Sequence, residues 1–387
     1  MKKSLIAAAI AVAASAAVQA EQPSFSVNPA VADVHNRCIV RFQDSYSGAE
    51  ATSISHRLVA EARAAGHSNA SAQYIYRNTI KGLTINLPCS AAAAVFAGDT
   101  TIMHMTPDSV VSISAPPSCT GPNCGGGSTA QVTPYGITRV GGPVDGSGHD
   151  AWVIDTGIDL DNPDLNVDAS RGFSAITSGK SAGEIDDDHG HGSHVAGTIG
   201  AIDNGIDVVG VAANATVIPV KVLDHRGSGT TSGVIAGVDY VGANAAPGDC
   251  ANMSLGGGVS QDLDDAVVAA SQKSGAFFVL AAGNDGDDAN NHSPARANGN
   301  NVRTISAIDS NDTMPSWSNW GNPPVDYAAP GVSILSIRAG GGTTTMSGTS
   351  MASPHACAVM MMTNGHPSTS GTANGDPDGD PDSIIHL

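Results

Sequence analysis

Hydrophobic and polar positions follow two different rhythms along the chain. Between residues 37 and 105, short apolar stretches predict strands, and two alanine-rich stretches predict helices. The order is βαββαβ, which is typical of a small two-layer domain in which the first and third strands pair antiparallel. The predicted strands are 37–47, 73–78, 81–88 and 101–105, and the predicted helices are 49–65 and 90–98.

After residue 130, continuous Val/Ile runs alternate with helical segments of small residues. This alternation predicts an α/β fold, a mainly parallel sheet with helices on both faces. Functional residues in such sheets gather at the carboxyl ends of the strands, where Asp155, Ser254 and Asn284 stand. The predicted strands are 151–157, 215–223, 250–257 and 276–284, and the predicted helices are 191–201, 232–243 and 264–275.

The segments outside these two regions suggest export. Lys2 and Lys3 precede an apolar run and small residues up to Ala20, which predicts a signal peptide over 1–20 and a secreted protein. No later segment holds about eighteen uninterrupted apolar residues, so we expect no membrane span. A Pro/Gly-rich linker at 115–130 separates an N-terminal domain, 21–118, from the main domain, 131–387.

Charge and cysteines narrow the environment and the partners. The formal net charge is −19, and nearly all of the negative excess follows residue 118, which disfavours nucleic acid and anionic membranes as partners. Six cysteines in an exported chain are expected to be mostly paired, although sequence leaves their connectivity open. The pairs that lie within one region are Cys38 with Cys89, Cys119 with Cys124, and Cys250 with Cys357.

The stretch DDDHGHGSHVAGT, residues 186–198, places three carboxylates directly before three imidazoles. His189, His191 and His194 could be ligands of a metal-dependent hydrolase, or one of them could be a general base. His191 begins the predicted helix, and His194 lies one turn deeper on nearly the same face, where a packing role is commoner. His189 precedes the helix and is expected to be solvated or to form a turn.

Three further residues could complete a nucleophilic site. Ser350 stands where a glycine-rich loop enters an apolar helix, a position that suits a helix cap but also aims backbone N–H groups at an oxyanion. Asn284 follows a buried strand, as a turn residue or an oxyanion donor. Asp155 could cap a turn or orient a base. Serine, base, orienting acid and oxyanion donor are the set that acyl transfer requires.

Five segments together resemble, in order, the signature blocks of the subtilisin-like serine proteases, especially the secreted proteinase K-like branch. The resemblance implies that Asp155 orients the general base His191, Ser350 is the nucleophile and Asn284 donates to the oxyanion. Residues 21–118 resemble the inhibitor-type propeptide of these enzymes. The segments are VIDTGID (153–159), GHGSHVAGT (190–198), SLGGG (254–258), AAGN (281–284) and GTSMASPH (348–355).

The resemblance also implies a substrate site and a maturation pathway. We expect a monomeric endopeptidase of broad specificity that acts on proteins and peptides, is inhibited by its own propeptide, and cuts itself free within the linker. No cofactor is needed for the chemistry, and structural calcium is implied without assigned ligands. The implied substrate-binding residues are Ser254, Leu255, Gly256, Gly257, Ala281, Ala282 and Gly283.

The chain departs from the family pattern near its end. Cys357 enters the helix behind Ser350, either as a small apolar residue or as the partner of Cys250, and the region after this helix is short. Alternating aspartates in GDPDGDPD, 375–382, loosely resemble a calcium loop, but a solvated acidic tail is favoured. These departures keep open a catalytically impaired relative that binds peptides or calcium.

Overall fold

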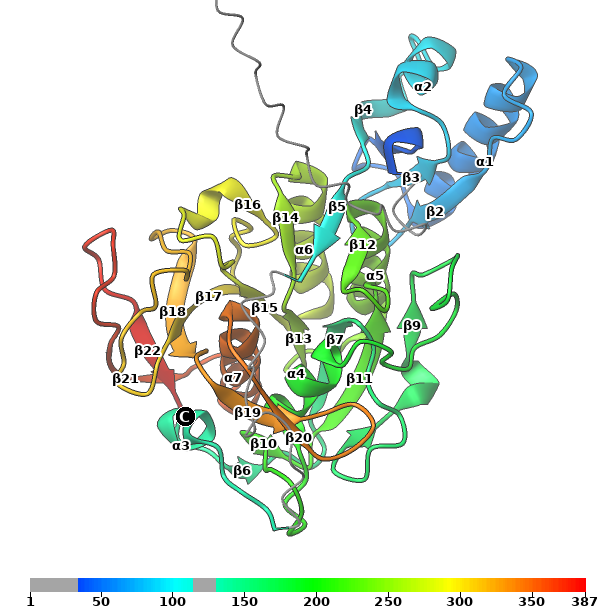
Figure 1. Ribbon diagram of the computed structural model, residues 1–387. Helices are drawn as coiled ribbons and strands as arrows, with labels where there is room; N and C mark the ends of the chain where they lie inside the picture. Colours follow the sequence, from blue (N-terminus) through cyan, green and yellow to red (C-terminus); the bar gives the residue numbers. More distant parts are fainter. Residues whose placement is uncertain (1–33, 114–129) are drawn as a thin grey trace, which may run out of the picture.

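The computed structural model describes residues 34–113 and 130–387, which form a small N-terminal domain seated on a larger one (Figure 1). The predicted signal peptide, most of the predicted linker, and Cys119 with Cys124 lie outside the described residues. Within the two described ranges, no helix is long and apolar enough to cross a bilayer.

The small domain contains the six elements that the sequence predicts. Its sheet has the order β2-β3-β1-β4, and β1 pairs antiparallel with β3. Cys38 and Cys89, one of the pairs that lie within one region, form a disulfide, and Cys89 opens α2. The elements are β1 (Cys38–Phe42), α1 (Gly48–Ala64), β2 (Ala72–Tyr76), β3 (Gly82–Ile85), α2 (Cys89–Val95) and β4 (Ile102–Pro107).

The large domain is built on a central sheet of order β21-β22-β18-β17-β15-β13-β7-β11-β8, in which β9 also pairs with β11. Every pairing except that of β21 with β22 is parallel, which confirms the predicted sheet. Its strands are β7 (Asp150–Asp155), β8 (Asn166–Val167), β9 (Phe173–Ser174), β11 (Thr216–Lys221), β13 (Cys250–Met253), β15 (Phe277–Ala281), β17 (Val302–Ile308), β18 (Val325–Pro330), β21 (Ser368–Thr372) and β22 (Ser383–His386).

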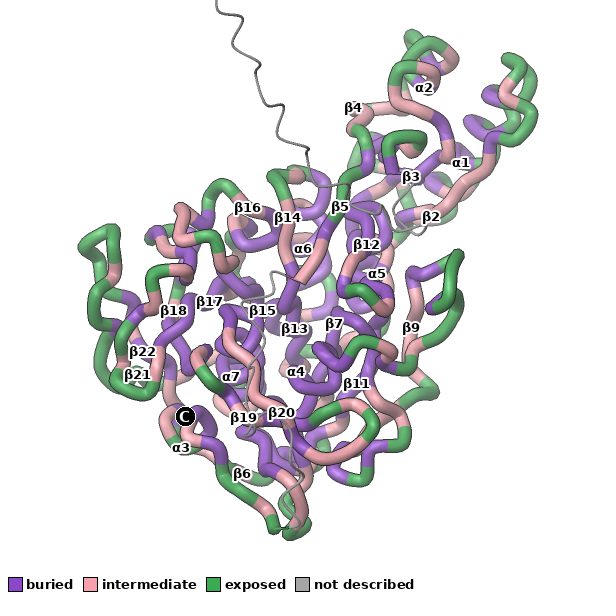
Figure 2. Tube along the Cα trace, in the orientation of Figure 1, coloured by how far each residue is buried: buried purple, intermediate pink, exposed green. Residues whose placement is uncertain are grey.

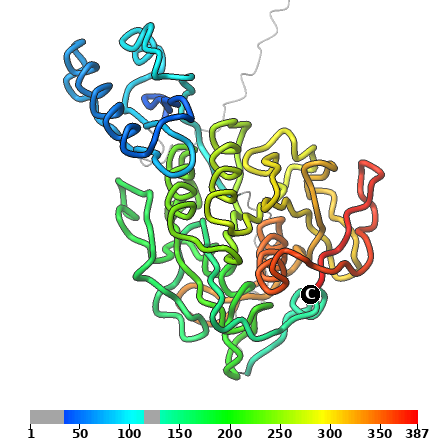
Figure 3. The backbone as a smooth tube through the Cα atoms, turned by 180° about the vertical axis from the view of Figure 1, so that it is seen from behind, coloured from blue at the N-terminus to red at the C-terminus, as the bar shows by residue number. Residues whose placement is uncertain are grey.

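Helices cover both faces of this sheet because successive side chains of each strand point to opposite faces. Along β7, Ala151 and Val153 join the core beneath α4 and α7, whereas Trp152 and Ile154 join the core beneath α5 and α6. Figure 2 shows these strands as buried, and Figure 3 shows the helices from behind. The helices are α3 (Tyr135–Arg139), α4 (His191–Gly200), α5 (Thr231–Asn244), α6 (Gln261–Ser274) and α7 (Thr349–Met362).

Shorter elements complete the two domains. The remaining strands are β5 (Val110–Ser112), β6 (Val144–Asp145), β10 (Ala212–Ala213), β12 (Ser228–Thr230), β14 (Gly256–Gly258), β16 (His292–Ser293), β19 (Ile334–Ile337) and β20 (Thr343–Met346), and the 3-10 helices are η1 (Val34–Asn36), η2 (Ala169–Arg171) and η3 (Ala289–Asn291).

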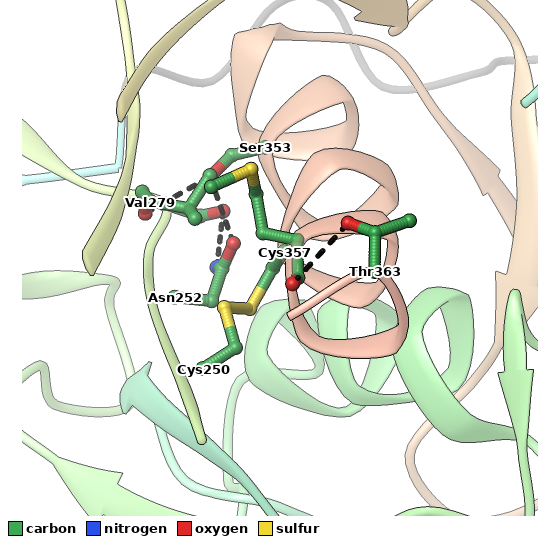
Figure 4. Close-up of a disulfide and its surroundings, with 8 residues drawn as sticks. Cys250, Asn252, Val279, Ser353, Cys357 and Thr363 are labelled. Carbon is green, nitrogen blue, oxygen red and sulfur yellow. Dashed lines mark hydrogen bonds between the residues drawn. A yellow bond between two sulfur atoms is a disulfide. The ribbon is translucent and has the colours of Figure 1, made fainter. Parts of the chain in front are cut away.

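A second disulfide fixes α7 against the sheet (Figure 4). Cys250 on β13 bonds to Cys357 on α7, with the two Cα atoms 5.7 Å apart. One turn before Cys357, the Ser353 hydroxyl donates to Asn252 Oδ1 at 2.8 Å. The bond therefore resolves the alternatives for Cys357 in favour of pairing, and it anchors the helix that presents Ser350.

The end of the chain corrects the expectation of a solvated acidic tail. β22 adds to the central sheet beside β18, and it buries Ile384 and Ile385 completely. Asp382 is also buried, and its carboxylate accepts a hydrogen bond from the Ser306 hydroxyl. The aspartates before it remain largely exposed. The segment folds because a pair of isoleucines follows the acidic run and can enter the sheet.

Candidate active site

Asp155 and His191 meet at the carboxyl end of the sheet. Asp155 ends β7 and is fully buried, and its carboxylate lies 2.8 Å and 3.0 Å from His191 Nδ1. Burial lowers the pKa of His191, but the charge and hydrogen bond of Asp155 together with the charge of Asp187 outweigh it, so the pKa lies above the usual value. Because Asp155 accepts a hydrogen bond from Nδ1–H, Nε2 is the atom that can take up a further proton.

Asp187 holds the backbone that presents His191. Its carboxylate is buried and accepts hydrogen bonds from the backbone N–H groups of His189, Gly190 and Ser193, and from the hydroxyls of Thr156 and Ser193. A carboxylate is favourable at this place because it satisfies donors at the N-terminus of α4 that have no partner within the helix.

A close approach also fixes the start of α4. A Cβ at Gly192 would lie 2.0 Å from the carbonyl oxygen of Gly157, so only glycine fits there. The first turn of the helix therefore rests directly on the turn that follows Asp155.

The other two histidines of this stretch do not join a metal cluster. His194 is fully buried, its Nε2 lies 3.0 Å from the carbonyl oxygen of Ile334, and burial lowers its pKa to about 3. His189 is exposed, and its ring centroid lies 6.4 Å from that of His191. Among residues 34–113 and 130–387, no group of three or more His, Cys, Asp or Glu side chains is arranged to hold a metal ion. The arrangement thus disfavours the metal-dependent hydrolase.

Ser350 lies at the second position of α7 and is almost fully buried. Its hydroxyl donates to the carbonyl oxygen of Ser254 at 3.2 Å, and no hydrogen bond joins it to His191 in the described part of the chain. Contacts between a nucleophile and its base are often long without substrate and shorten when substrate binds.

Asn284 lies beside Ser350. Its Oδ1 accepts from the backbone N–H of Thr349 at 2.8 Å and from the Thr349 hydroxyl at 3.0 Å. An amide whose oxygen is fixed in this way presents its NH₂ group as the donor. Asn284 and the N-terminus of α7 therefore both offer donors at the site of Ser350.

A pocket opens next to Ser350 and brings most of the predicted substrate-binding residues together. It has a volume of about 240 Å³. Ser254 is not among the lining residues; its hydroxyl donates to the carbonyl oxygen of Ser350, and its own carbonyl oxygen accepts from the Ser350 hydroxyl. The lining residues are Ser112, Leu255, Gly256, Gly257, Ala281, Ala282, Gly283, Asn284, Asp285, His292, Ala295, Thr349 and Ser350.

A strand from the N-terminal side lies in the cleft that leads to this pocket. β5 pairs antiparallel with β12 on one side and with β14 on the other, in a sheet of order β12-β5-β14-β16. Val111 is buried opposite Gly229 and Gly257, and Ile113 N–H donates to the carbonyl oxygen of Gly227 at 3.1 Å. One edge of β14, which contains Gly256 and Gly257 of the predicted substrate-binding residues, is thus paired with this chain's own segment.

The N-terminal domain docks on α5 and α6 through carboxylates. Asp108 accepts from the N–H and the hydroxyl of Ser232 at the start of α5. Asp239 on α5 accepts from backbone N–H groups of the 77–79 turn. Asp262 on α6 accepts from the Thr106 hydroxyl at 2.6 Å and lies 2.8 Å from His104 Nε2. These contacts hold the domain so that β5 reaches the cleft.

One loop of the large domain has the chemistry of a calcium site. Asp164 is fully buried, its Oδ1 has no hydrogen-bond partner among the described residues, and burial raises its pKa to about 7. Its Oδ2 accepts from Val208 N–H at 3.3 Å, and Asn204 Nδ2 lies 3.5 Å from the carbonyl oxygen of the neighbouring Pro163. Calcium prefers such oxygen ligands, so a cation fits this carboxylate.

Sequence reasoning missed several of these residues. It gave no role to β5, to Asp187 or to the pocket residues Asp285 and His292. Of these, only β5 has a recognisable pattern in the sequence, because the apolar residues Val110 and Val111 stand at the end of the N-terminal region. The three aspartates before His189 are chemically identical, so only the fold distinguishes the buried Asp187.

Comparison with known proteins identifies the family. The model of the subtilase family matches residues 152–372, which is more than half of the chain. The chain therefore belongs to the subtilase family, and it has the subtilisin-like fold.

Individual relatives agree with this assignment. The chain is 48% identical over 216 residues to alkaline serine exoprotease A of Vibrio alginolyticus, covering 56% of this chain and 38% of that protein. It is 46% identical over 215 residues to subtilisin-like protease 4 of Trichophyton equinum, covering 54% of this chain and 51% of that protein. The matches thus span about half or less of the length of these curated relatives.

A solved structure shows the same fold. The crystal structure of a cold-adapted subtilisin-like serine proteinase matches with a TM-score of 0.57 and 38% sequence identity, covering 65% of this chain and 97% of that one.

Proposed function

We propose that this protein is a secreted, monomeric serine endopeptidase made as a self-processing precursor. The observation that carries the proposal is the path of β5, whose antiparallel pairing leads to the pocket formed by Ser350 and Asn284. A substrate that pairs through its main chain in this way is accepted with many different side chains, so the specificity is broad.

The reaction follows from the geometry around Ser350. His191 Nε2 removes the proton of Ser350 Oγ, which attacks the substrate carbonyl carbon, while Asp155 accepts from Nδ1–H. Asn284 and the N-terminal N–H groups of α7 stabilise the oxyanion. His191 then gives the proton to the leaving amine, and water releases the acyl group by the reverse sequence.

The N-terminal domain acts as an inhibitor in this proposal. Residues 34–113 bury Asp239 and Asp262 of the large domain, and β5 blocks the edges at which a substrate pairs. Since β5 runs toward Ser350, self-cleavage occurs in the first peptide bonds after Ile113. Disulfides in both domains support an oxidising, extracellular destination.

Expression of the full chain and of Ser350→Ala tests the proposal. The unaltered chain should mature to a smaller form that hydrolyses casein, with an N-terminus within a few residues after Ile113. Ser350→Ala should remain at full length and be inactive, while added active enzyme cleaves it. Unaided maturation of Ser350→Ala, or casein hydrolysis by this variant, would contradict self-cleavage by Ser350.

We also propose that Asp164 holds structural calcium and that calcium has no part in the chemistry. In the Ser350→Ala background, calcium at about 100 times its Kd should add about 2.7 kcal/mol to the unfolding free energy. Asp164→Asn should remove this gain, whereas the control Asp161→Asn, at an exposed carboxylate, should keep it. If calcium still stabilises the Asp164→Asn variant, Asp164 does not hold the ion.

A further inference from the structure

The pocket beside Ser350 has an acidic wall that its small apolar residues do not explain. Six of its thirteen lining residues are glycine or alanine, but Asp285 and His292 also face it. Asp285 Oδ2 lies 3.7 Å from His292 Nδ1, and Asp287 Oδ2 lies 3.4 Å from His292 Nε2. Two carboxylates therefore flank one imidazole at this wall, and the group is negative whether or not the imidazole is protonated.

A buried amide holds the backbone of this wall in place. Asn319 is fully buried, and its Oδ1 accepts from the N–H groups of Asp285 at 2.9 Å and Asp287 at 3.1 Å. Its Nδ2 donates to the carbonyl oxygen of Ala282, which itself lines the pocket. The backbone that carries the two carboxylates is therefore held in place, so little conformational entropy is lost there when a ligand binds.

Asp285 leans toward the pocket. It lines the pocket beside Gly283, and its side chain is 54% exposed. The floor beyond it is apolar, with Ala281 and Leu255 buried. An occupant with a long aliphatic stem and a cationic end matches both features, because the stem covers the apolar floor and the charge reaches the acidic wall.

We propose that Asp285, supported by Asp287 at the other nitrogen of His292, makes this pocket select a cationic side chain, lysine or arginine, on the residue whose carbonyl Ser350 attacks. The inference rests on the proposed function and deepens it, because broad main-chain recognition then acquires a charge preference at one position. Both carboxylates are about half exposed, at 54% and 48%, so solvent screens the effect. We expect about a three- to tenfold preference over a neutral side chain of the same length.

Peptidyl p-nitroanilides that differ only at this residue test the proposal. Lysine is compared with norleucine, which has the same chain without the charge, and glutamine is compared with glutamate. The value of kcat/KM should be higher for lysine than for norleucine, and higher for glutamine than for glutamate. Both ratios should shrink at about 1 M salt, a response that a purely steric pocket does not give.

The Asp285→Asn variant tests whether the preference for a cationic side chain comes from the acidic wall. The lysine-to-norleucine ratio should fall about threefold, whatever the change in kcat/KM for norleucine itself, and Asp161→Asn should leave both ratios as they are. Equal cleavage of lysine and norleucine substrates, or a ratio that Asp285→Asn does not alter, would overturn the inference. No cleavage of any substrate would instead count against the proposed function.

Discussion

Replacing Asp187 by alanine removes the buried carboxylate at the N-terminus of α4. The two oxygens of this carboxylate accept hydrogen bonds from five donors at 2.6–3.0 Å, which are three backbone N–H groups and two hydroxyls. Hydrogen bonds to a charged group contribute about 1.5–3 kcal/mol each, but bonds that share one carboxylate are not additive. Some of the donors will also find water, because Asp187 is 8% exposed. We therefore expect a loss of about 3–5 kcal/mol.

The loss is measured as a change in the urea denaturation of the large domain, followed by tryptophan fluorescence. The Ser350→Ala background prevents self-digestion during the measurement. Asp186→Ala is the matched control, because Asp186 is an exposed neighbour whose carboxylate accepts, among the described residues, from the N–H groups of Leu160 and Asp187 alone. It should cost less than about 1 kcal/mol. The reasoning is refuted if Asp187→Ala costs no more than Asp186→Ala.

The other predictions concern the active site and the second disulfide. Asn284→Ala should lower kcat by about 10²–10³ with little change in KM, and steady-state kinetics showing near-normal turnover would rule out the oxyanion role. Breaking the Cys250–Cys357 bond with a double serine substitution in the Ser350→Ala background should lower the unfolding free energy by about 2–5 kcal/mol, and unchanged thermal unfolding would show that α7 does not depend on it. The pKa of His191 is raised, so kcat/KM should begin to fall, as the pH is lowered, at a pH above the usual histidine pKa. Asp155→Asn should shift this acidic decline of kcat/KM to lower pH. An unchanged pH profile would contradict the coupling of Asp155 to His191.

The sequence was sufficient for the parts of the fold that repeat a simple pattern. Val/Ile runs and small-residue helices predict the parallel sheet, and the ends of its strands place Asp155 and Asn284 on one edge. Helical spacing distinguishes His191 from His194, and the structure confirms that His194 packs against the backbone of Ile334. These features depend on local periodicity, which a sequence displays directly.

The features that the sequence did not predict depend on contacts between distant segments. β5 has three residues, and its two neighbours follow it by more than a hundred positions. The acidic tail has the composition of a solvated segment, but burial of Ile384 draws it into the sheet. Asp285 and Asp287 gain their arrangement from Asn319, more than thirty residues later in the chain. Composition cannot show such partners.

Labelling with a fluorophosphonate probe tests the central claim that Ser350 is a nucleophile activated by His191. The mature enzyme should lose all activity on casein as it gains one adduct, and peptide mapping should place this adduct on Ser350. Mature His191→Ala, released from its precursor by added active enzyme, should label far more slowly at the same serine. An adduct on another residue, or casein hydrolysis that resists the probe and stops with a chelator, would contradict the account.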